Sequence, residues 1–340
     1  MKRIGILGAG TWGMALARML TVSGNDVLVW SAIEKEIDSL STTRKHPNLP
    51  QMKIPDELRF TKSIEEVCKD KDILLFAVPS VFVRSTAAKA RPYVADGQII
   101  VDVAKGIEPD TLYTMTEILA DELGKEGGPK ACVLWPCPAP PTPRKWPSTC
   151  PPPSCRPARI GRAAAYVQEV FTNNVMRVYT NEDIKGVELS GAMKNVIALG
   201  VGISTGLGYG DNARAASSPA ASRDRPSGRG DGLQCPHVRR SGRHRRLIVT
   251  ATSMHSRNNR AGILIGKGET PENAVKEVGM VVEGMNALPA ALELAERYQV
   301  EMPIVQTVNA IVNKGMSAAE AVKSLMERGL KNELPQGYEK

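Results

Sequence analysis

The sequence is poor in aromatic residues and has no long apolar run. Aromatic side chains make up 4% of the 340 residues, against 42% for apolar residues, so the core must be mainly aliphatic. The stretch Ile4–Leu7 is as long as a strand, far below the ~18–20 residues of a membrane-spanning helix. Met1–Arg3 has the charge of a secretory leader, but Gly8 and Gly10 interrupt the apolar stretch that a leader needs. We therefore expect a soluble, cytoplasmic protein of two domains, since a domain usually holds ~100–200 residues.

The cysteines lack the spacing of a metal site or a disulfide scaffold. Four of the six fall within Cys132–Cys155, at separations of five, thirteen and five. Zinc-binding cysteines usually stand roughly two to four residues apart, and disulfide frameworks belong to short secreted chains. We predict free thiols and no metal site.

The net charge of +8 is unevenly distributed. Residues 136–162 carry +5 and residues 214–246 carry +7, which leaves −4 for the rest of the chain. Basic segments can bind phosphate backbones, but these two lack the interleaved aromatic residues of a surface that stacks bases. We expect an acidic enzyme body without a nucleic-acid partner. A nucleic-acid binder that uses the Arg-rich segment is the alternative.

A glycine-rich turn follows the first predicted strand. Arg3–Leu7 predicts a buried strand, and a helical pattern, Met14–Leu20, and a second strand, Val27–Trp30, come after it. Between the first strand and the helix stands the segment Gly8-Ala9-Gly10-Thr11-Trp12-Gly13. Glycines at this spacing, between a strand and a helix, indicate a dinucleotide-binding site.

Each glycine of the turn has an expected role. Gly8 would form the tight turn, Gly10 would let the backbone approach a pyrophosphate, and Gly13 would let the helix pack on the strand. The start of the helix would then offer unpaired N–H groups to the phosphates. A glycine-rich turn without a ligand is the alternative.

The residues after the second strand bear on the choice of cofactor. In this fold a carboxylate there usually binds the ribose 2′-hydroxyl of NAD. Here the position holds Ser31-Ala32-Ile33, and the first acid is Glu34. The missing acid removes repulsion against a 2′-phosphate, and Lys35 adds a weak attraction. The sequence therefore allows both NADH and NADPH and favours NADPH.

The first half of the chain continues as alternating strands and helices. Strands are predicted at Ile73–Val78 and Ile99–Val103, and helices at Ser63–Cys68 and Val81–Ala90. This alternation predicts an α/β fold, a Rossmann-type doubly wound parallel sheet, as a dinucleotide-binding domain over residues 1–180.

The second half predicts an all-helical substrate domain over residues 181–340. Its helical patterns are Ile184–Gly208, Glu269–Gln299 and Ser317–Arg328. Thr270 and Ser317 stand where N-caps are expected.

Three basic features are candidates for chemistry. Lys105 follows a predicted strand, at the edge of the sheet where ligands bind. Lys194 stands among small and apolar residues in a predicted helix, and burial of an amine favours proton exchange near neutral pH. The segment Ser256–Arg260 combines two guanidinium groups with hydroxyl and amide donors, which suits a phosphate. Ordinary solvated basic side chains are the alternative for all three.

Several motifs stand in order along the chain: GAGTWG, VPS, AKGIE, GVELSGAMKNVIALGVGISTGLGYGDNARAA, TSMHSRNNRAG, VVEG and EMPI. Together they resemble bacterial NAD(P)-dependent glycerol-3-phosphate dehydrogenases, over residues 1–133, 166–216 and 247–333. The resemblance implies hydride transfer between a nicotinamide and sn-glycerol 3-phosphate or dihydroxyacetone phosphate. It also implies a homodimer and a role in glycerophospholipid biosynthesis. A related dehydrogenase that acts on another hydroxy acid is the nearest rival.

The resemblance also assigns roles to residues. Lys194 would be the general acid/base, and Lys105 would lie between the nicotinamide and the substrate. The substrate-binding residues would be Lys105, Lys194, Ser256, Arg257 and Asn258. The cofactor-binding residues would be Gly8, Gly10, Thr11, Trp12, Gly13, Lys105, Arg257, Val281 and Glu283.

Two segments depart from the family pattern. The family has Ser-Gly-Pro after the position of Leu134, where this chain has Trp135-Pro136-Cys137. It has Gly-Asp-Leu before the Ile-Val-Thr motif, where this chain has Arg245-Arg246-Leu247. Pro136–Pro157 holds ten of the 24 prolines, which is incompatible with a helix or a central strand.

We hypothesise that residues 136–162 and 214–246 are read out of frame, since shifted GC-rich codons yield proline and arginine. Genuine disordered loops are the alternative, although a polar stretch this long is unusual inside a compact domain. If the sequence is literal, the substrate pocket is altered. A nucleotide-binding protein with impaired or no turnover is then the alternative function.

Overall fold

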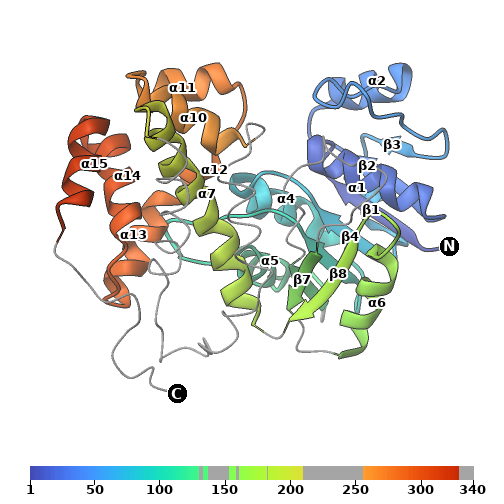
Figure 1. Cartoon of the computed structure of the whole chain (residues 1–340). Helices are drawn as coiled ribbons and strands as arrows, with labels where there is room; N and C mark the ends of the chain where they lie inside the picture. The colour runs from blue at the N-terminus through green and yellow to red at the C-terminus, as the bar shows by residue number, and fades with distance from the viewer. Residues whose placement is uncertain (130–132, 137–152, 158–160, 182, 210–255, 329–340) are drawn as a thin grey trace.

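The computed structural model describes residues 1–129, 133–136, 153–157, 161–181, 183–209 and 256–328. A sheet with its flanking helices forms one side of the molecule, and a group of helices forms the other (Figure 1). The long helix α7 (Ile184–Gly206) packs against α10, α12 and α14 and also contacts strand β7. Most of the two basic, proline- and arginine-rich segments lies outside the described residues.

Six parallel strands form the main sheet in the order β3-β2-β1-β4-β5-β6, which is the strand order of the Rossmann fold. The strands are β1 (Arg3–Leu7), β2 (Asp26–Trp30), β3 (Arg59–Thr61), β4 (Ile73–Phe76), β5 (Ile99–Asp102) and β6 (Val133–Pro136). Ile6 of β1 is paired with Val29 on one side and Leu75 on the other. The strand order reverses between β1 and β4, which is where such sheets bind ligands.

Helices cover both faces of this sheet. They are α1 (Thr11–Val22), α2 (Glu34–Thr43), α3 (Ile64–Cys68), α4 (Val83–Ala90), α5 (Met115–Leu123) and α6 (Gly161–Phe171), with 3-10 turns η1 (Ser80–Phe82) and η2 (Arg91–Tyr93). A second, two-stranded parallel sheet pairs β7 (Pro153–Pro157) with β8 (Arg177–Asn181). The predicted division between residues 180 and 181 stays a prediction; β8 ends at Asn181 and α7 begins at Ile184.

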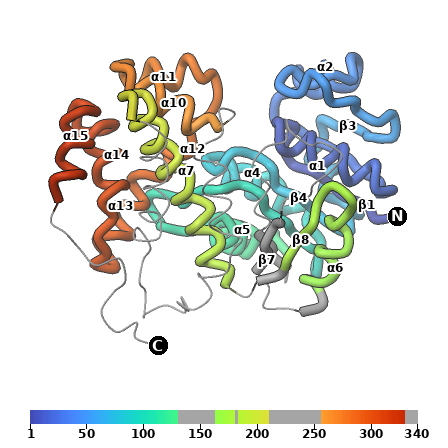
Figure 2. Tube along the Cα trace, viewed as in Figure 1, coloured from blue at the N-terminus to red at the C-terminus, as the bar shows by residue number. Residues whose placement is uncertain are grey.

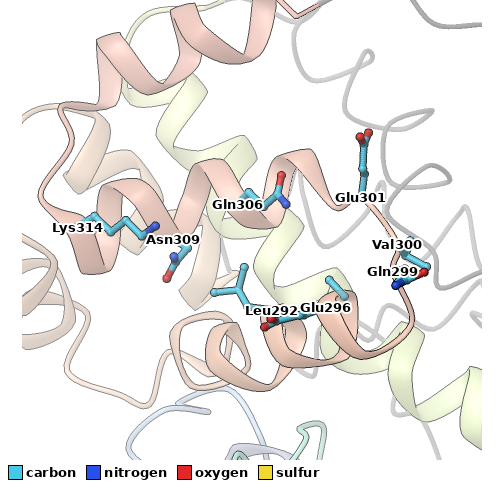
Figure 3. A pocket seen from close by; sticks show the side chains of 9 residues that line it. Leu292, Glu296, Gln299, Val300, Glu301, Gln306, Asn309 and Lys314 are labelled. Atoms are coloured by element: carbon cyan, nitrogen blue, oxygen red, sulfur yellow. The ribbon is translucent and has the colours of Figure 1, made fainter.

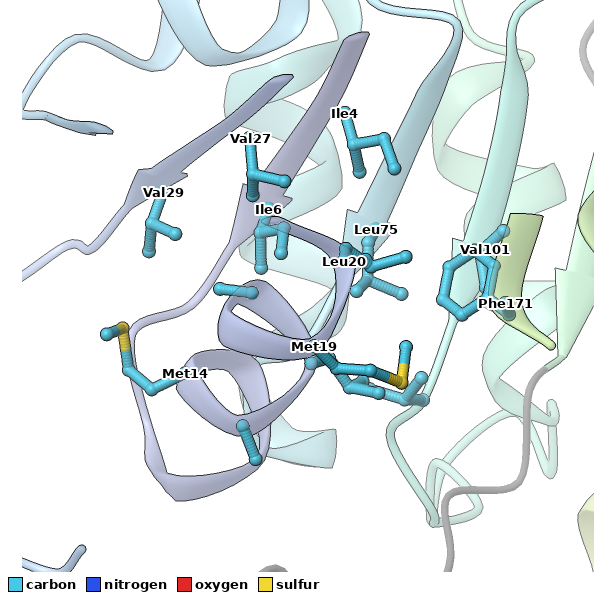
Figure 4. Packing of buried hydrophobic residues seen from close by; sticks show 14 of the residues in the cluster. Ile4, Ile6, Met14, Met19, Leu20, Val27, Val29, Leu75, Val101 and Phe171 are labelled. Atoms are coloured by element: carbon cyan, nitrogen blue, oxygen red, sulfur yellow. The ribbon is translucent and has the colours of Figure 1, made fainter. Parts of the chain in front are cut away.

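Alternate residues along the central strands lie in the two apolar clusters on opposite faces of the sheet. Ile4 and Ile6 lie with Leu75 in a cluster that α1 and Phe171 of α6 close (Figure 4). Leu7 and Phe76 lie in the opposite cluster, against α3, α4 and α5. Because both faces are buried, the strands read as nearly continuous apolar runs, as in other parallel sheets.

The helical side contains α7, α10 (Arg257–Gly266), α11 (Pro271–Val278), α12 (Glu283–Asn286), α13 (Leu288–Arg297), α14 (Pro303–Lys314) and α15 (Ala318–Met326). Figure 2 shows α10 to α15 as the carboxy-terminal, orange-to-red part of the chain, beside the green-to-yellow α7. The single helical pattern predicted over Glu269–Gln299 is wrong, because it comprises three helices. Gly279 ends α11 in the left-handed conformation, with φ of 67°, and turns the chain. Thr270 and Ser317 act as N-caps, as predicted.

Glycines bring α7 and α10 into backbone contact. A Cβ atom on Gly202 of α7 would lie 2.3 Å from the carbonyl oxygen of Asn259, and one on Gly262 of α10 would lie 2.2 Å from that of Leu199. Side chains at these positions would therefore force the helices apart. This packing holds the start of α10 beside the middle of α7.

Within the described residues, no helix is long and apolar enough to cross a membrane.

Candidate active site at the carboxyl edge of the sheet

The turn after β1 has the tight geometry predicted from its glycines. Gly8 has a φ of 120°, and a Cβ there would lie 2.8 Å from the backbone of Ala77. A Cβ on Gly13 would lie 1.9 Å from the carbonyl oxygen of Gly8. The two glycines therefore let α1 start directly against the ends of β1 and β4.

The middle glycine of the turn, Gly10, is different. Gly10 has φ of −64° and ψ of 176°, which any residue adopts, and a Cβ there would have no atom within 4 Å. No side chain caps α1, and its first turn holds no acid. Beside this open space the Oγ1 of Thr11 is buried without a hydrogen-bond partner among the described residues. A free helix start and an orphaned hydroxyl fit a bound pyrophosphate.

Lys105 joins the turn to helix α7. It follows β5, and its Nζ lies 6.0 Å from the centroid of the Trp12 ring, a cation–π distance. Its Cγ lies 3.9 Å from where a Cβ on Gly191 of α7 would be. Lys105 thus lies between Trp12 of the glycine-rich turn and helix α7, and its expected place beside the substrate stays a prediction.

Lys194 lies on α7 close to this point. It is partly buried, and because it follows Gly191 by three positions it shares that face of the helix. Its Nζ donates a hydrogen bond of 3.2 Å to Oδ1 of Asn195. The carbonyl oxygen of Asn195 lies 2.6 Å from where a Cβ on Gly284 would be, so α12 starts directly against α7.

The predicted phosphate-binding residues begin α10. Ser256 is the N-cap, and its Oγ accepts a hydrogen bond of 3.3 Å from the N–H of Asn259. Burial lowers the pKa of the Arg257 guanidinium, while the nearby Glu283 carboxylate raises it. Oδ1 of Asn258 accepts a hydrogen bond of 2.8 Å from the N–H of Gly284. Asn258 therefore fixes the start of α12 through its side chain.

Glu283 links the two halves of the site. Its Oε2 accepts a hydrogen bond of 2.6 Å from Oγ of Ser80, and its Oε1 accepts one of 3.3 Å from the N–H of Ser80. A Cβ on Gly106, next to Lys105, would lie 2.5 Å from Cβ of Ser80. Val281, the other residue predicted from the VVEG motif, is partly buried two positions earlier. The predicted residues of the turn, β5, α7, α10 and α12 thus come together at one edge of the sheet.

Sequence reasoning missed a buried pair of acids behind Lys105. Asp102, the last residue of β5, is 1% exposed, and burial and the nearby Glu188 carboxylate raise its pKa well above the usual value. Burial raises the pKa of Glu188 on α7 to about 6, although Thr116 donates hydrogen bonds of 3.0 and 2.6 Å to it from its N–H and Oγ1. The signal in the sequence was an acid between valines, three residues before Lys105.

Other candidate features of the described part lie elsewhere or are inert. Cys68 is a buried free thiol, and burial raises its pKa to about 12, so it is not a nucleophile. No group of three or more His, Cys, Asp or Glu in the part that the structure describes could hold a metal ion. A hollow of about 500 Å³ lies between α13 and α14, lined by Leu292, Gln306 and Lys314 among others (Figure 3). None of the predicted site residues lines it.

A Rossmann sheet with a glycine-rich turn, next to helices that carry cationic side chains, is typical of dinucleotide-dependent dehydrogenases. Comparisons with known proteins narrow this class. The family model for the N-terminus of NAD-dependent glycerol-3-phosphate dehydrogenase matches residues 3–136, and that for its C-terminus matches residues 183–221 and 246–323. The chain belongs to this family, and the resemblance predicted from the motifs is confirmed.

Individual relatives agree. The chain is 54% identical over 354 residues to glycerol-3-phosphate dehydrogenase (NAD(P)+) 2 of Lactobacillus delbrueckii subsp. bulgaricus, covering 98% of this chain and 99% of that protein. It is 39% identical to the glycerol-3-phosphate dehydrogenase (NAD(P)+) of Bacillus subtilis, covering 98% and 96%. The crystal structure of the Coxiella burnetii glycerol-3-phosphate dehydrogenase superposes with a TM-score of 0.84 at 27% identity, covering 96% and 99%. The predicted fold class is confirmed as well.

Proposed function

We propose that this protein reduces dihydroxyacetone phosphate to sn-glycerol 3-phosphate with NADH or NADPH, and so supplies the backbone of glycerophospholipids. One observation carries the proposal: Lys105 lies between Trp12 of the glycine-rich turn and Gly191 of α7, one helical turn before Lys194. Arg257 is near the Glu283 carboxylate, which binds Ser80 after β4. The names of the bacterial relatives support the same reaction.

The amino-terminal residues would hold the dinucleotide. The open space at Gly10 and the start of α1 would receive the pyrophosphate, and the buried Thr11 hydroxyl would gain the partner it lacks. When bound, the reduced nicotinamide supplies a hydride to the carbonyl carbon of the substrate.

The start of α10 would hold the substrate phosphate. The Arg257 side chain is partly buried, and a planar guanidinium binds phosphate oxygens in pairs. Ser256 accepts a backbone hydrogen bond through its oxygen, which leaves its own hydrogen free to donate. Asn258 would keep these groups in place through Gly284.

Lys194 would complete the reaction. As the carbonyl carbon gains the hydride, negative charge develops on the oxygen, and the Nζ of Lys194 would deliver a proton there to form the alcohol. The ammonium of Lys105 would stabilise the same developing charge. Lys194 would then regain its proton from solvent.

The test is oxidation of NADH, and separately NADPH, by the purified chain with dihydroxyacetone phosphate, with intact mass measured on the same sample. We expect substrate-dependent oxidation, and a loss of about 10²–10⁴-fold in kcat for Lys194→Ala. Lys185→Ala is a matched control on the same helix, since the Lys185 side chain is 44% exposed and pairs with Glu117. Nucleotide binding without oxidation would contradict the proposal, and oxidation at an unexpected mass would point to an error in the recorded sequence.

We also infer a homodimer in the cytoplasm, which rests on the family resemblance. Sedimentation equilibrium of the purified chain and fractionation of the source cells would test the two statements separately. A monomer that turns over at full rate would overturn the first.

A further inference from the structure

The residue directly after β2 is a buried serine that binds an acid. Ser31 is largely inaccessible, and its Oγ donates a hydrogen bond of 2.6 Å to Oε2 of Glu36. The same Oγ accepts a hydrogen bond of 3.2 Å from the N–H of Ile33. Glu36 is the third residue of α2 and is only partly buried. Its carboxylate is therefore held at the end of β2, with Oε1 left as an acceptor.

In a Rossmann fold, the side chain at the end of β2 determines whether the adenosine ribose can carry a 2′-hydroxyl or a 2′-phosphate. A carboxylate there accepts a hydrogen bond from the 2′-hydroxyl and repels a 2′-phosphate. The sequence favoured NADPH because no acid stands between β2 and Glu34. In the structure, α2 turns back and brings an acid from further along the chain to the end of β2. The missing acid before Glu34 is therefore no longer a reason to expect NADPH.

The other charged side chains of α2 near Glu36 are mostly acidic, like Glu36 itself. Glu34 lies in the same helical turn as Glu36, and Asp38 follows in the next. The nearby cation Lys62 is paired with Asp38 at 2.7 Å and with Glu34 at 3.7 Å. The exposed Lys35 is then opposed by three acids on its own helix.

We propose that Glu36, held by Ser31, selects NADH over NADPH by accepting the ribose 2′-hydroxyl and repelling a 2′-phosphate. This inference rests on the dinucleotide site of the proposed function. Glu36 is a specificity-determining residue at the far end of the cofactor from the reacting atoms, so it acts on binding and not on the chemical step.

A purely structural role for Glu36 is the competing explanation, in which it only fixes the start of α2. Glu36→Gln separates the two, because glutamine keeps an oxygen that accepts from Ser31 but carries no charge. Glu34→Gln is the matched control, since Glu34 lies in the same turn, its side chain is 73% exposed, and it does not contact Ser31.

The experiment measures dissociation constants of the full chain by calorimetry for NADH and NADPH, and for the fragments AMP and adenosine 2′,5′-bisphosphate. We expect NADH to bind more tightly than NADPH in the natural chain. Glu36→Gln should shrink that ratio by about tenfold, equivalent to about 1.4 kcal/mol, mainly through tighter NADPH binding. Glu34→Gln should change the ratio much less than Glu36→Gln, because the Glu34 side chain is exposed and paired with Lys62.

A second measurement needs no variant. Raising the salt concentration should narrow the ratio between the two nucleotides in the natural chain, because salt screens repulsion between exposed charges. Tighter binding of NADPH, or an unchanged ratio in a folded Glu36→Gln variant, would overturn the inference while leaving the dehydrogenase intact. Binding of neither nucleotide would overturn the dinucleotide site, and the proposed function with it.

Discussion

Oγ of Ser80 donates a hydrogen bond of 2.6 Å to Oε2 of Glu283, although the two residues lie 203 positions apart in the chain. Ser80 begins the 3-10 turn after β4, and Glu283 begins α12. The bond therefore ties the nucleotide-binding sheet to the helices that carry Arg257 and Asn258. The hydrogen bonds from Thr116 to Glu188 on α7 join the same two parts of the structure at a second place.

Ser80→Ala should weaken the contact between the sheet and the start of α12. The variant loses one side-chain hydrogen bond to a carboxylate, so we expect a rise of roughly 2–10-fold in KM for dihydroxyacetone phosphate, equivalent to about 0.5–1.5 kcal/mol. Steady-state kinetics measures it. Ser85→Ala on α4 is the control, because the exposed Ser85 hydroxyl donates to the carbonyl of Phe82, the N-cap of α4, and does not contact Glu283 through a hydrogen bond in the described part. Equal KM values in the two variants would contradict a role for the contact.

Gly10 and Gly13 should respond to alanine in opposite ways. Gly10 has ordinary backbone angles and open space around it, so Gly10→Ala should fold with an unchanged Tm and bind NADH less tightly. A Cβ on Gly13 would lie 1.9 Å from the Gly8 carbonyl oxygen, so Gly13→Ala should lower the Tm. Thermal unfolding and nucleotide titration on both variants check this. Tight NADH binding by Gly10→Ala would show that the open space is not the pyrophosphate site.

Gly202→Ala should destabilise the helical domain, although alanine normally stabilises a helix by about 1 kcal/mol relative to glycine. The added Cβ would lie 2.3 Å from the Asn259 carbonyl oxygen and 2.9 Å from Cα of Gly262. We expect a loss of about 1–3 kcal/mol in the free energy of unfolding, as for other overpacked cores.

Gly200→Ala is the matched control for this packing. It lies on the same helix, and its Cβ would meet only the side-chain ends of Val308 and Ile304, at 3.2 and 3.3 Å. Urea unfolding of both variants measures the difference. Equal stability of the two would mean that α7 and α10 do not need their backbone contact.

The sequence predicted the parts of this protein that are locally determined. The strands from Arg3 and Val27 and the turn between them follow from apolar runs and glycine spacing within about thirty residues. Lys105 could be placed because residues that follow parallel strands share one edge of the sheet. Its neighbour Gly191 lies on a helix that only the folded chain brings there.

The parts that could not be predicted depend on distant contacts or on side-chain direction. Neither Ser80 nor Glu283 has a local partner that marks it, and the bond between them exists only after the domains meet. Glu36 reaches Ser31 because α2 turns back over the strand end, which spacing along the chain does not show. Gly279 breaks an amphipathic pattern that otherwise continues, because its left-handed φ ends the helix.

The buried acids Asp102 and Glu188 should make stability depend on pH. The pKa of Glu188 is about 6 in the folded chain, above its ordinary value of 4.5, so between these pH values the folded chain keeps a proton that the unfolded chain has lost. The free energy of unfolding should therefore fall as pH rises through this window, by about 2 kcal/mol. The raised pKa of Asp102 acts in the same direction.

Glu188→Gln tests this dependence. Glutamine carries no charge to bury and still accepts from Thr116, so the decline between pH 4.5 and 6 should shrink by about 2 kcal/mol, and the part that Asp102 causes should remain. The variant should also gain stability relative to the natural chain at neutral pH. Urea unfolding as a function of pH measures both effects. Glu320→Gln, at an exposed N-terminal turn of α15, should retain the decline. A decline of undiminished size in Glu188→Gln would mean that Glu188 does not cause it and that the hydrogen bonds from Thr116 hold Glu188 in the charged form.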